Sequence, residues 1–310
     1  MKRNLILFFA AAILAPAAYS QKPNNPLVGR WDFNITRENV SRAVWLGVTD
    51  KDGSLEVWYQ PTGGHVYQVK DFKAEGSHLA VTVSPATGNR PAEILELDAA
   101  GDKITGVQKR GDTTFALTGV RAPELKRAAP AAWTLPEPLF NGKNLDGWEP
   151  IGNPANSRWI VKDGLLINED HGANLKSTRQ FDDFKVHFEV NCPEPGNSGF
   201  YLRGRYEVQI EYESPNENPP ERQMGSIYGR IAPKELPRMP GQWETFDVTL
   251  VGRTVTVVRN GVTTIDRWEI EGITGGALDA NEGEPGPFYI QGDHTGGLKF
   301  RNVTVSVPKR

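Results

Sequence analysis

Cysteine is almost absent from this chain of 310 residues, which contains one, Cys192. One cysteine cannot form an internal disulfide, so a small disulfide-stapled scaffold is excluded, and the chain is long enough to be stabilised by a hydrophobic core. Beyond the N-terminus, apolar runs of about 20 residues, the length that spans a bilayer, are missing. No charge of one sign dominates either, since 35 Lys and Arg stand against 38 Asp and Glu. A nucleic-acid partner is therefore not expected, because it would need a basic surface.

The N-terminus has the pattern of a secretory signal peptide over residues 1–20. Lys2 and Arg3 form a basic start, an apolar stretch occupies residues 5–14, and Ala18-Tyr19-Ser20 supplies small residues for cleavage. An uncleaved N-terminal anchor is the alternative. Export without disulfides is typical of a bacterial periplasm. We therefore expect a periplasmic or secreted protein without a membrane span.

The rest of the chain divides into two strand-rich parts joined by a proline-rich stretch. Residues 25–121 contain short strand-like segments separated by Asp-Gly and Glu-Gly corners about every ten residues, which is typical of an antiparallel meander. About eight such strands predict a small, lipocalin-like β-barrel with a binding or packing role. Residues 122–138 predict an extended linker, in which Trp133 is expected to pack on one of the domains.

Residues 139–310 also alternate with period two and lack long helical periodicity. Asn260-Gly261 is the strongest hairpin signal in the chain. About a dozen strands over this length predict a jelly-roll β-sandwich. The expected fold class of the whole chain is therefore all-β.

The stretch Asn-Ser-Gly-Phe-Tyr-Leu-Arg-Gly-Arg-Tyr-Glu-Val-Gln-Ile-Glu-Tyr, residues 197–212, predicts a hairpin whose polar face carries reactive groups. A three-residue loop that pairs Arg203 with Glu207 and Tyr201 with Gln209 would keep every apolar side chain on one face. In that register, the nearby guanidinium would keep the Glu207 carboxyl ionised. A plain ion pair on a solvated face is the alternative.

The residues from 139 onward resemble the 3-keto-disaccharide hydrolase family, formerly domain of unknown function 1080. The matching motifs occur in the family's order: Leu-Phe-Asn-Gly-Lys-Asn-Leu-Asp-Gly-Trp (139–148), Asn-Ser-Gly-Phe-Tyr-Leu-Arg (197–203), Tyr-Glu-Val-Gln-Ile (206–210), Gly-Ser-Ile-Tyr-Gly (225–229), Ile-Gln-Gly-Asp-His (290–294) and Phe-Arg-Asn-Val (300–303). The resemblance implies a concanavalin-like double sheet in an often exported protein of glycoside breakdown. Gln-Gly-Asp-His departs from the family's usual Leu-Gln-x-His-Gly.

The activity implied by the resemblance acts on a sugar oxidised at C3. A base removes the acidified C2 proton, the C1 substituent leaves by β-elimination, and water adds to the enone. By motif position, Glu207 would be the base, Arg203 the enolate stabiliser, and His294 or Tyr228 the acid. Substrate contacts are expected from Tyr201, Gln209, Asp293, Trp148 and Trp159. No cofactor is assigned, and the implied partner is an oxidoreductase that makes the 3-keto-glycoside.

Three alternatives remain open from the residues alone. A conventional glycoside hydrolase needs two carboxylates about 5.5–9.5 Å apart, whereas Glu207 and Glu211 lie about 13 Å apart along one strand. Its second carboxylate would then come from another strand, such as Glu169, Asp170 or Asp293. A non-catalytic sugar-binding protein would use Trp148, Trp159 and Trp243 as stacking surfaces. A divalent metal at His171, Asp293 and His294 lacks the support of a spaced ligand motif.

Overall fold

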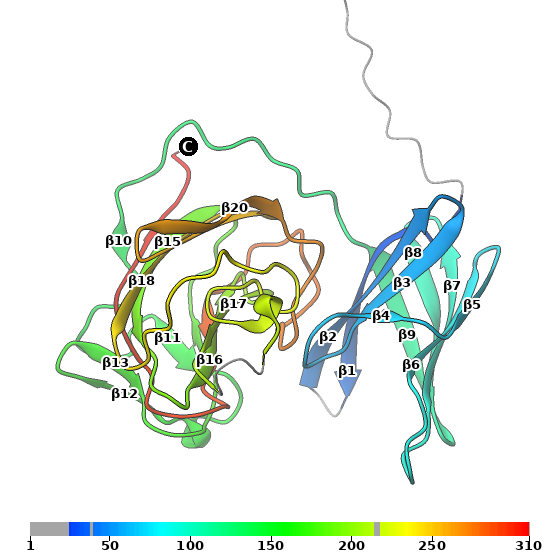
Figure 1. Cartoon of the computed structure of the whole chain (residues 1–310), viewed down its shortest axis with the longest axis horizontal. Helices are drawn as coiled ribbons and strands as arrows, with labels where there is room; N and C mark the ends of the chain where they lie inside the picture. Colours follow the sequence, from blue (N-terminus) through cyan, green and yellow to red (C-terminus); the bar gives the residue numbers. More distant parts are fainter. Residues whose placement is uncertain (1–24, 38–39, 214–217, 310) are drawn as a thin grey trace, which may run out of the picture.

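The computed structural model describes residues 25–37, 40–213 and 218–309, so the expected signal peptide lies outside the described residues. The chain forms a barrel and a sandwich that lie side by side, and the segment between them runs over the surface of the sandwich (Figure 1). Within the described ranges, no helix is long and apolar enough to span a bilayer. The predicted all-β class is confirmed.

The barrel is one antiparallel sheet of nine strands in the order β4-β3-β2-β1-β9-β8-β7-β6-β5. Its strands are β1 (Gly29–Arg37), β2 (Val40–Lys51), β3 (Ser54–Gln60), β4 (Tyr67–Val69), β5 (Phe72–Glu75), β6 (His78–Ser84), β7 (Glu93–Ala100), β8 (Lys103–Arg110) and β9 (Thr113–Arg121). Lys70 and Asp71 separate β4 from β5, which form the two opposite edges and nearly close the sheet.

The sandwich packs an eight-stranded sheet against a five-stranded one. The larger sheet contains β10 (Glu137–Pro138), β12 (Trp159–Lys162), β13 (Leu165–Asn168), β15 (Phe184–Asn191), β18 (Trp243–Val251), β19 (Thr254–Arg259), β20 (Val262–Glu269) and β22 (Lys299–Ser306). The smaller sheet has the order β11 (Trp148–Pro150), β14 (Leu175–Ser177), β21 (Tyr289–Ile290), β16 (Asn197–Leu202) and β17 (Tyr206–Glu211). Two short 3-10 helices, Pro154–Asn156 and Pro220–Arg222, lie in the loops.

Local sequence explains the best-predicted parts of the sandwich. Asn260 and Gly261 both have positive φ, 50° and 75°, and form the two-residue turn between β19 and β20. Along β15, alternate residues are buried, as the period-two pattern predicts. Phe188 from this strand stacks between Phe200 and Phe246 at 4.2 and 5.0 Å between ring centroids, which joins the two sheets.

The segment that follows β9 is attached to the sandwich instead of spanning free solvent. Arg253 donates to the Pro123 carbonyl over 2.7 Å, and Arg127 pairs with Asp182 at 2.6 Å. Trp133 bridges to Pro308 and lies under the Lys185 ammonium. The expectation that Trp133 packs on a domain is therefore confirmed.

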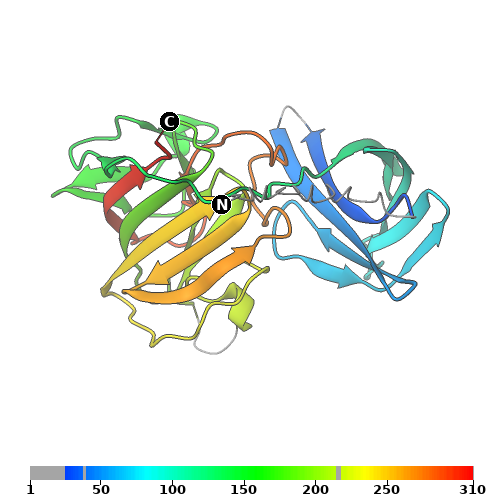
Figure 2. The ribbon, with the colours of Figure 1, turned by 90° about the horizontal axis from the view of Figure 1, so that it is seen from above.

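The barrel contacts the sandwich through the loop between β3 and β4. The Gln60 amide donates to the Gly64 carbonyl over 2.9 Å and shapes this loop. Gly276 of the sandwich donates to the Thr62 carbonyl over 3.0 Å, and a side chain at Gly275 would collide with the Gly64 backbone. Figure 2 shows this sandwich segment, in orange, between the two bodies. The barrel is thus packed against a segment that also contacts Glu207, through Thr274.

Candidate active site on the small sheet

The hairpin of β16 and β17 has a different register from the predicted one. Tyr201 lies opposite Glu207, and Leu202 lies opposite Tyr206. The predicted pairing of Arg203 with Glu207 is therefore wrong by two residues. An even shift leaves each side chain on its expected face, so Tyr201, Glu207 and Gln209 still share one face. Arg203 lies instead in the turn, with φ of 52°.

The Arg203 guanidinium points away from Glu207 and is fully buried. It donates to the Gly252 carbonyl over 2.8 Å and to the Tyr206 hydroxyl over 3.2 Å, and it pairs with Asp182 at 3.3 Å. These partners lie on the core side of the hairpin, because Tyr206 and Glu207 point to opposite faces. Arg203 is thus a structural residue of the turn and does not reach the candidate site.

Glu207 is 3% exposed and lies on the outer face of β17, the edge strand of the small sheet. Two segments cover this edge: Tyr228 N–H donates to the Glu207 carbonyl, and Glu207 N–H donates to Thr274 Oγ1, both over 3.0 Å. On the neighbouring strand, a side chain at Gly199 would reach within 2.2 Å of Glu207 Oε1. Glycine at position 199 therefore makes the space for the carboxyl group.

The Tyr201 hydroxyl connects Glu207 to its surroundings. It lies 2.8 Å from Glu207 Oε2 and 2.7 Å from the Gly275 carbonyl, and it accepts a hydrogen bond from Gln291 Nε2 over 3.0 Å. Tyr201 also stacks on Tyr289 at 3.8 Å. A phenol has a single proton, so Tyr201 satisfies both acceptors only when Glu207 is protonated and donates to it.

Burial raises the pKa of Glu207 to about 8, and this outweighs the hydrogen bond from Tyr201, which favours the ionised form. The negative charge of Asp293 raises the pKa further. The expectation that a guanidinium keeps Glu207 ionised is therefore wrong. A carboxyl group with a pKa near neutrality can instead exchange a proton during a reaction.

Three residues linked to Glu207 through its strand or through Tyr201 have polar side-chain atoms without partners. Within the described residues, Gln209 Oε1, Ser226 Oγ and Gln291 Oε1 are buried and make no hydrogen bond. Gln209 is bound to Ser226 through the backbone, and Gln291 to Tyr201. Buried polar groups are normally satisfied, so three unsatisfied ones on residues linked to a carboxyl group with a raised pKa are typical of a site that binds a polar ligand.

Tyr228 and His294 are the two other predicted proton donors. Tyr228 is half-buried, and burial together with the charge of Glu207 raises its pKa, which keeps the phenol protonated. His294 lies in the loop after β21, where its Nδ1 is 3.0 Å from Asp293 Oδ1. This hydrogen bond raises the pKa of His294. Burial alone would raise the pKa of Asp293, but the bond and charge of His294 bring it below normal.

Trp148 and Trp159 lie in the sandwich core, 5% and 4% exposed. Their indole N–H groups donate to the carbonyls of Leu139 and Ala173, each over 2.9 Å. The prediction that they stack on sugar rings is wrong, because neither presents a ring face to solvent. Trp243 instead lies under the Arg301 guanidinium at 4.0 Å.

The metal alternative gains no support from the loop that holds His171. His171 Nδ1 lies 3.3 Å from the backbone carbonyl of His294. Across the described parts of the chain, no three His, Cys, Asp or Glu side chains gather as metal ligands.

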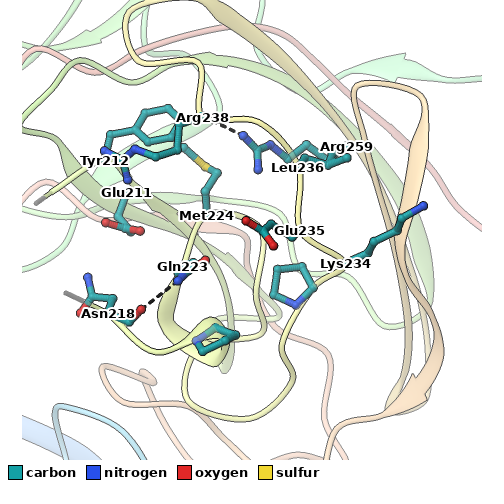
Figure 3. Close-up of a pocket in the computed structure, with 12 residues that line it drawn as sticks. Glu211, Tyr212, Asn218, Gln223, Met224, Lys234, Glu235, Leu236, Arg238 and Arg259 are labelled. Atoms are coloured by element: carbon teal, nitrogen blue, oxygen red, sulfur yellow. Dashed lines mark hydrogen bonds between the residues drawn. The ribbon is translucent and has the colours of Figure 1, made fainter. Parts of the chain in front are cut away.

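A cleft of about 210 Å³ opens at the far end of β17 from the turn. Glu211 borders it, together with Glu235, Lys234, Arg238 and Arg259, and Figure 3 shows these charged side chains among those that line it. Gln209 lies between Glu211 and Glu207 on the same face of the strand. The cleft and the buried carboxyl group are therefore joined along one polar strip.

The barrel contributes a residue that the sequence did not single out as functional. His65 Nδ1 lies 3.5 Å from Arg222 Nη1, and a side chain at Gly229 would collide with His65 Cβ. Arg222 in turn hydrogen-bonds to Tyr228 and, through its carbonyl, to Gln209. His65 and Arg222 lie 157 positions apart in the sequence, so no local pattern could pair them.

Comparison with known proteins finds a family match for the sandwich part of the chain. A family model of the 3-keto-alpha-glucoside-1,2-lyase-like domain matches residues 135–306, more than half of the sequence. No curated protein matches the chain. Two solved structures from Parabacteroides distasonis, named provisionally as glycosyl hydrolases, share 27% and 20% identity. They cover 59% and 56% of this chain and 93% and 92% of their own, with TM-scores of 0.46 and 0.44. From the family match, which confirms the resemblance of the motifs, we conclude that the chain belongs to the family of the 3-keto-alpha-glucoside-1,2-lyase-like domain.

Proposed function

We propose that this carbohydrate-active protein is exported and cleaves 3-keto-glycosides by elimination and hydration, with Glu207 as the base. The observation that carries the proposal is the buried Glu207 carboxyl group, whose pKa of about 8 suits a proton acceptor. Its position between Tyr201 and the unsatisfied Gln209 and Gln291 amide oxygens supplies contacts for sugar hydroxyl groups.

In this mechanism Glu207 takes the C2 proton, and the C2–H electron pair forms an enolate with the C3 ketone. The enolate then re-forms the ketone while its C2=C3 electron pair moves to make a C1=C2 double bond; the C1–O bond breaks, its electrons stay on the departing oxygen, and that oxygen takes a proton. Water adds its oxygen to C1 and a proton to C2. Because Arg203 is held in the core, we assign Tyr228 to the enolate oxygen and His294 to the departing oxygen.

The test is incubation of the protein with 3-keto-α-glucosides and their unoxidised parents in D₂O. We expect release of the C1 substituent from the keto sugars only, with deuterium incorporated at C2. Deuterium at C2 reports proton removal directly, and a conventional hydrolase does not place it there. Cleavage of the unoxidised parents would instead favour a carboxylate pair such as Glu207 and Asp293.

The pH dependence separates a base from an acid at position 207. A base must be deprotonated, so kcat/KM is expected to fall about tenfold per pH unit below pH 8. If Glu207 acted as an acid, kcat/KM would fall above pH 8 instead. A profile that stays flat from pH 5 to well above pH 8 would contradict both roles. In the control variant His294→Gln, the acidic limb should remain, because it belongs to Glu207.

A further inference from the structure

A second hollow, of about 540 Å³, lies between the barrel and the sandwich. We define this interdomain pocket by six of its lining residues: Arg30, Trp45, Glu56 and Trp58 from the barrel, and Arg230 and Glu271 from the sandwich. Its volume is within the range of small-molecule sites, roughly 300–1,000 Å³, and domain interfaces are common places for them.

The two tryptophans of the pocket differ in burial: Trp45 is buried in the interface and Trp58 is half-buried. Trp45 is 2% exposed, its indole lies over Gly47 and against Gly272 of the sandwich, and the Arg230 guanidinium lies 4.2 Å above it. It therefore anchors the interface. Trp58 is paired with Gly47 across β2 and β3 and remains half-buried. Trp58 packs against the interface cluster that contains Trp45, and the part of its ring that stays exposed lines the pocket and is the aromatic surface left for a ligand.

The charges of the pocket select the class of ligand. The wall contains two arginines, Arg30 and Arg230, and two glutamates, Glu56 and Glu271, so it has no net charge and offers both donors and acceptors. Arg30 is also paired with Glu269 at 3.1 Å, and Glu56 with Lys51 at 3.4 Å. Arg230 uses Nε and one terminal nitrogen to hold the Ile273 carbonyl, and its other nitrogen makes no hydrogen bond within the described residues. An aromatic surface with polar groups of both signs suits an uncharged sugar, whereas an anion would need an excess of arginine.

The pocket adjoins the candidate active site through two segments. The first segment contains Arg230 and, two positions earlier, Tyr228. The second contains Ile273, whose carbonyl accepts from Arg230, and the next residue, Thr274, whose hydroxyl accepts from Glu207 N–H. From these contacts we infer that the interdomain pocket is a second sugar-binding site, which holds a distal unit of the glycoside by stacking on Trp58. The inference rests on the proposed function for its substrate class.

Binding tests this inference without requiring turnover. Maltose, maltotriose and trehalose are titrated into the Glu207→Gln protein, and tryptophan fluorescence and calorimetry are recorded. Maltotriose should bind, and Trp58→Ala should weaken its binding at least about tenfold, because the sugar ring then has no aromatic face on which to stack. Trp58→Phe should restore part of the affinity. Trp268→Ala is the matched control, since Trp268 is 60% exposed and lies outside the pocket.

Glu56→Gln provides a second variant that keeps the aromatic surface and should weaken maltotriose binding severalfold. Equal affinity in Trp58→Ala and wild type, or no binding of any of the three sugars, overturns the sugar site even if 3-keto-glycosides are cleaved. Conversely, loss of sugar binding in Trp58→Ala supports the pocket even if no 3-keto-glycoside is turned over. The two proposals therefore fail separately.

Discussion

Glu207→Gln is expected to lower kcat/KM for a 3-keto-glycoside by about 10²- to 10⁴-fold, the usual contribution of a general base. The amide has nearly the shape of the carboxyl group and still offers an oxygen to Tyr201, 2.8 Å away in the native protein. Proton transfer is thus removed with little change in packing. The measurement is the rate of release of the C1 substituent, together with the exchange of the C2 proton in D₂O.

Glu211→Gln is the matched control, because Glu211 lies on the same strand and face as Glu207 but borders the cleft of Figure 3. It should leave C2 exchange nearly unchanged. If Glu207→Gln retains C2 exchange at the wild-type rate, Glu207 is not the base. If Glu211→Gln alone abolishes exchange, the reactive position lies at the cleft.

The same Glu207 variant should be more stable than wild type at high pH. The folded pKa of about 8 exceeds the ordinary value of 4.5, so the wild-type free energy of unfolding decreases as the pH rises from about 4.5 to 8. A shift of this size corresponds to roughly 3–5 kcal/mol at about 1.36 kcal/mol per unit. Urea unfolding should show this gain in Glu207→Gln at pH 8.5 and none at pH 4. Equal stability at both values would contradict the raised pKa.

Loss of the buried ion pair behind the cleft should have the largest effect on folding. Glu244 is 1% exposed, lies 2.5 Å from Arg259, and accepts from the Tyr212 hydroxyl at 2.5 Å. Glu244→Ala leaves the Arg259 charge buried without a partner, which costs about 3–5 kcal/mol. Urea unfolding monitored by circular dichroism measures the loss.

Two further variants test whether the loss of stability comes from the unpaired Arg259 charge. Glu96→Ala removes an ion pair with Lys109 whose side chains are 39% and 44% exposed, and it should cost less than about 1 kcal/mol. The double variant Glu244→Leu with Arg259→Met removes both charges and should recover most of the stability lost in Glu244→Ala. If the double variant is as unstable as the single one, the loss comes from packing and not from an unpaired charge.

Patterns that depend on neighbouring residues could be predicted from the sequence alone. Period-two alternation identified the strands and assigned Tyr201, Glu207 and Gln209 to one face, because side chains of a strand alternate whatever it pairs with. The Asn260-Gly261 turn followed from two residues that tolerate positive φ. The motifs of the last 172 or so residues indicated the family for the same reason, since they are read along the chain.

Contacts between distant segments decided the rest, and they lie beyond any local pattern. The predicted hairpin register paired Arg203 with Glu207, but the Gly252 carbonyl and the Asp182 carboxylate hold the Arg203 guanidinium in the core. The pKa of Glu207 rises because segments from positions 228 and 274 bury it. The barrel reaches the same face through Thr62 and His65, for which the sequence offered no signal. Alternation along a strand thus fixed which side chains face outward, whereas only tertiary packing determined their partners, their burial and therefore their proton affinity.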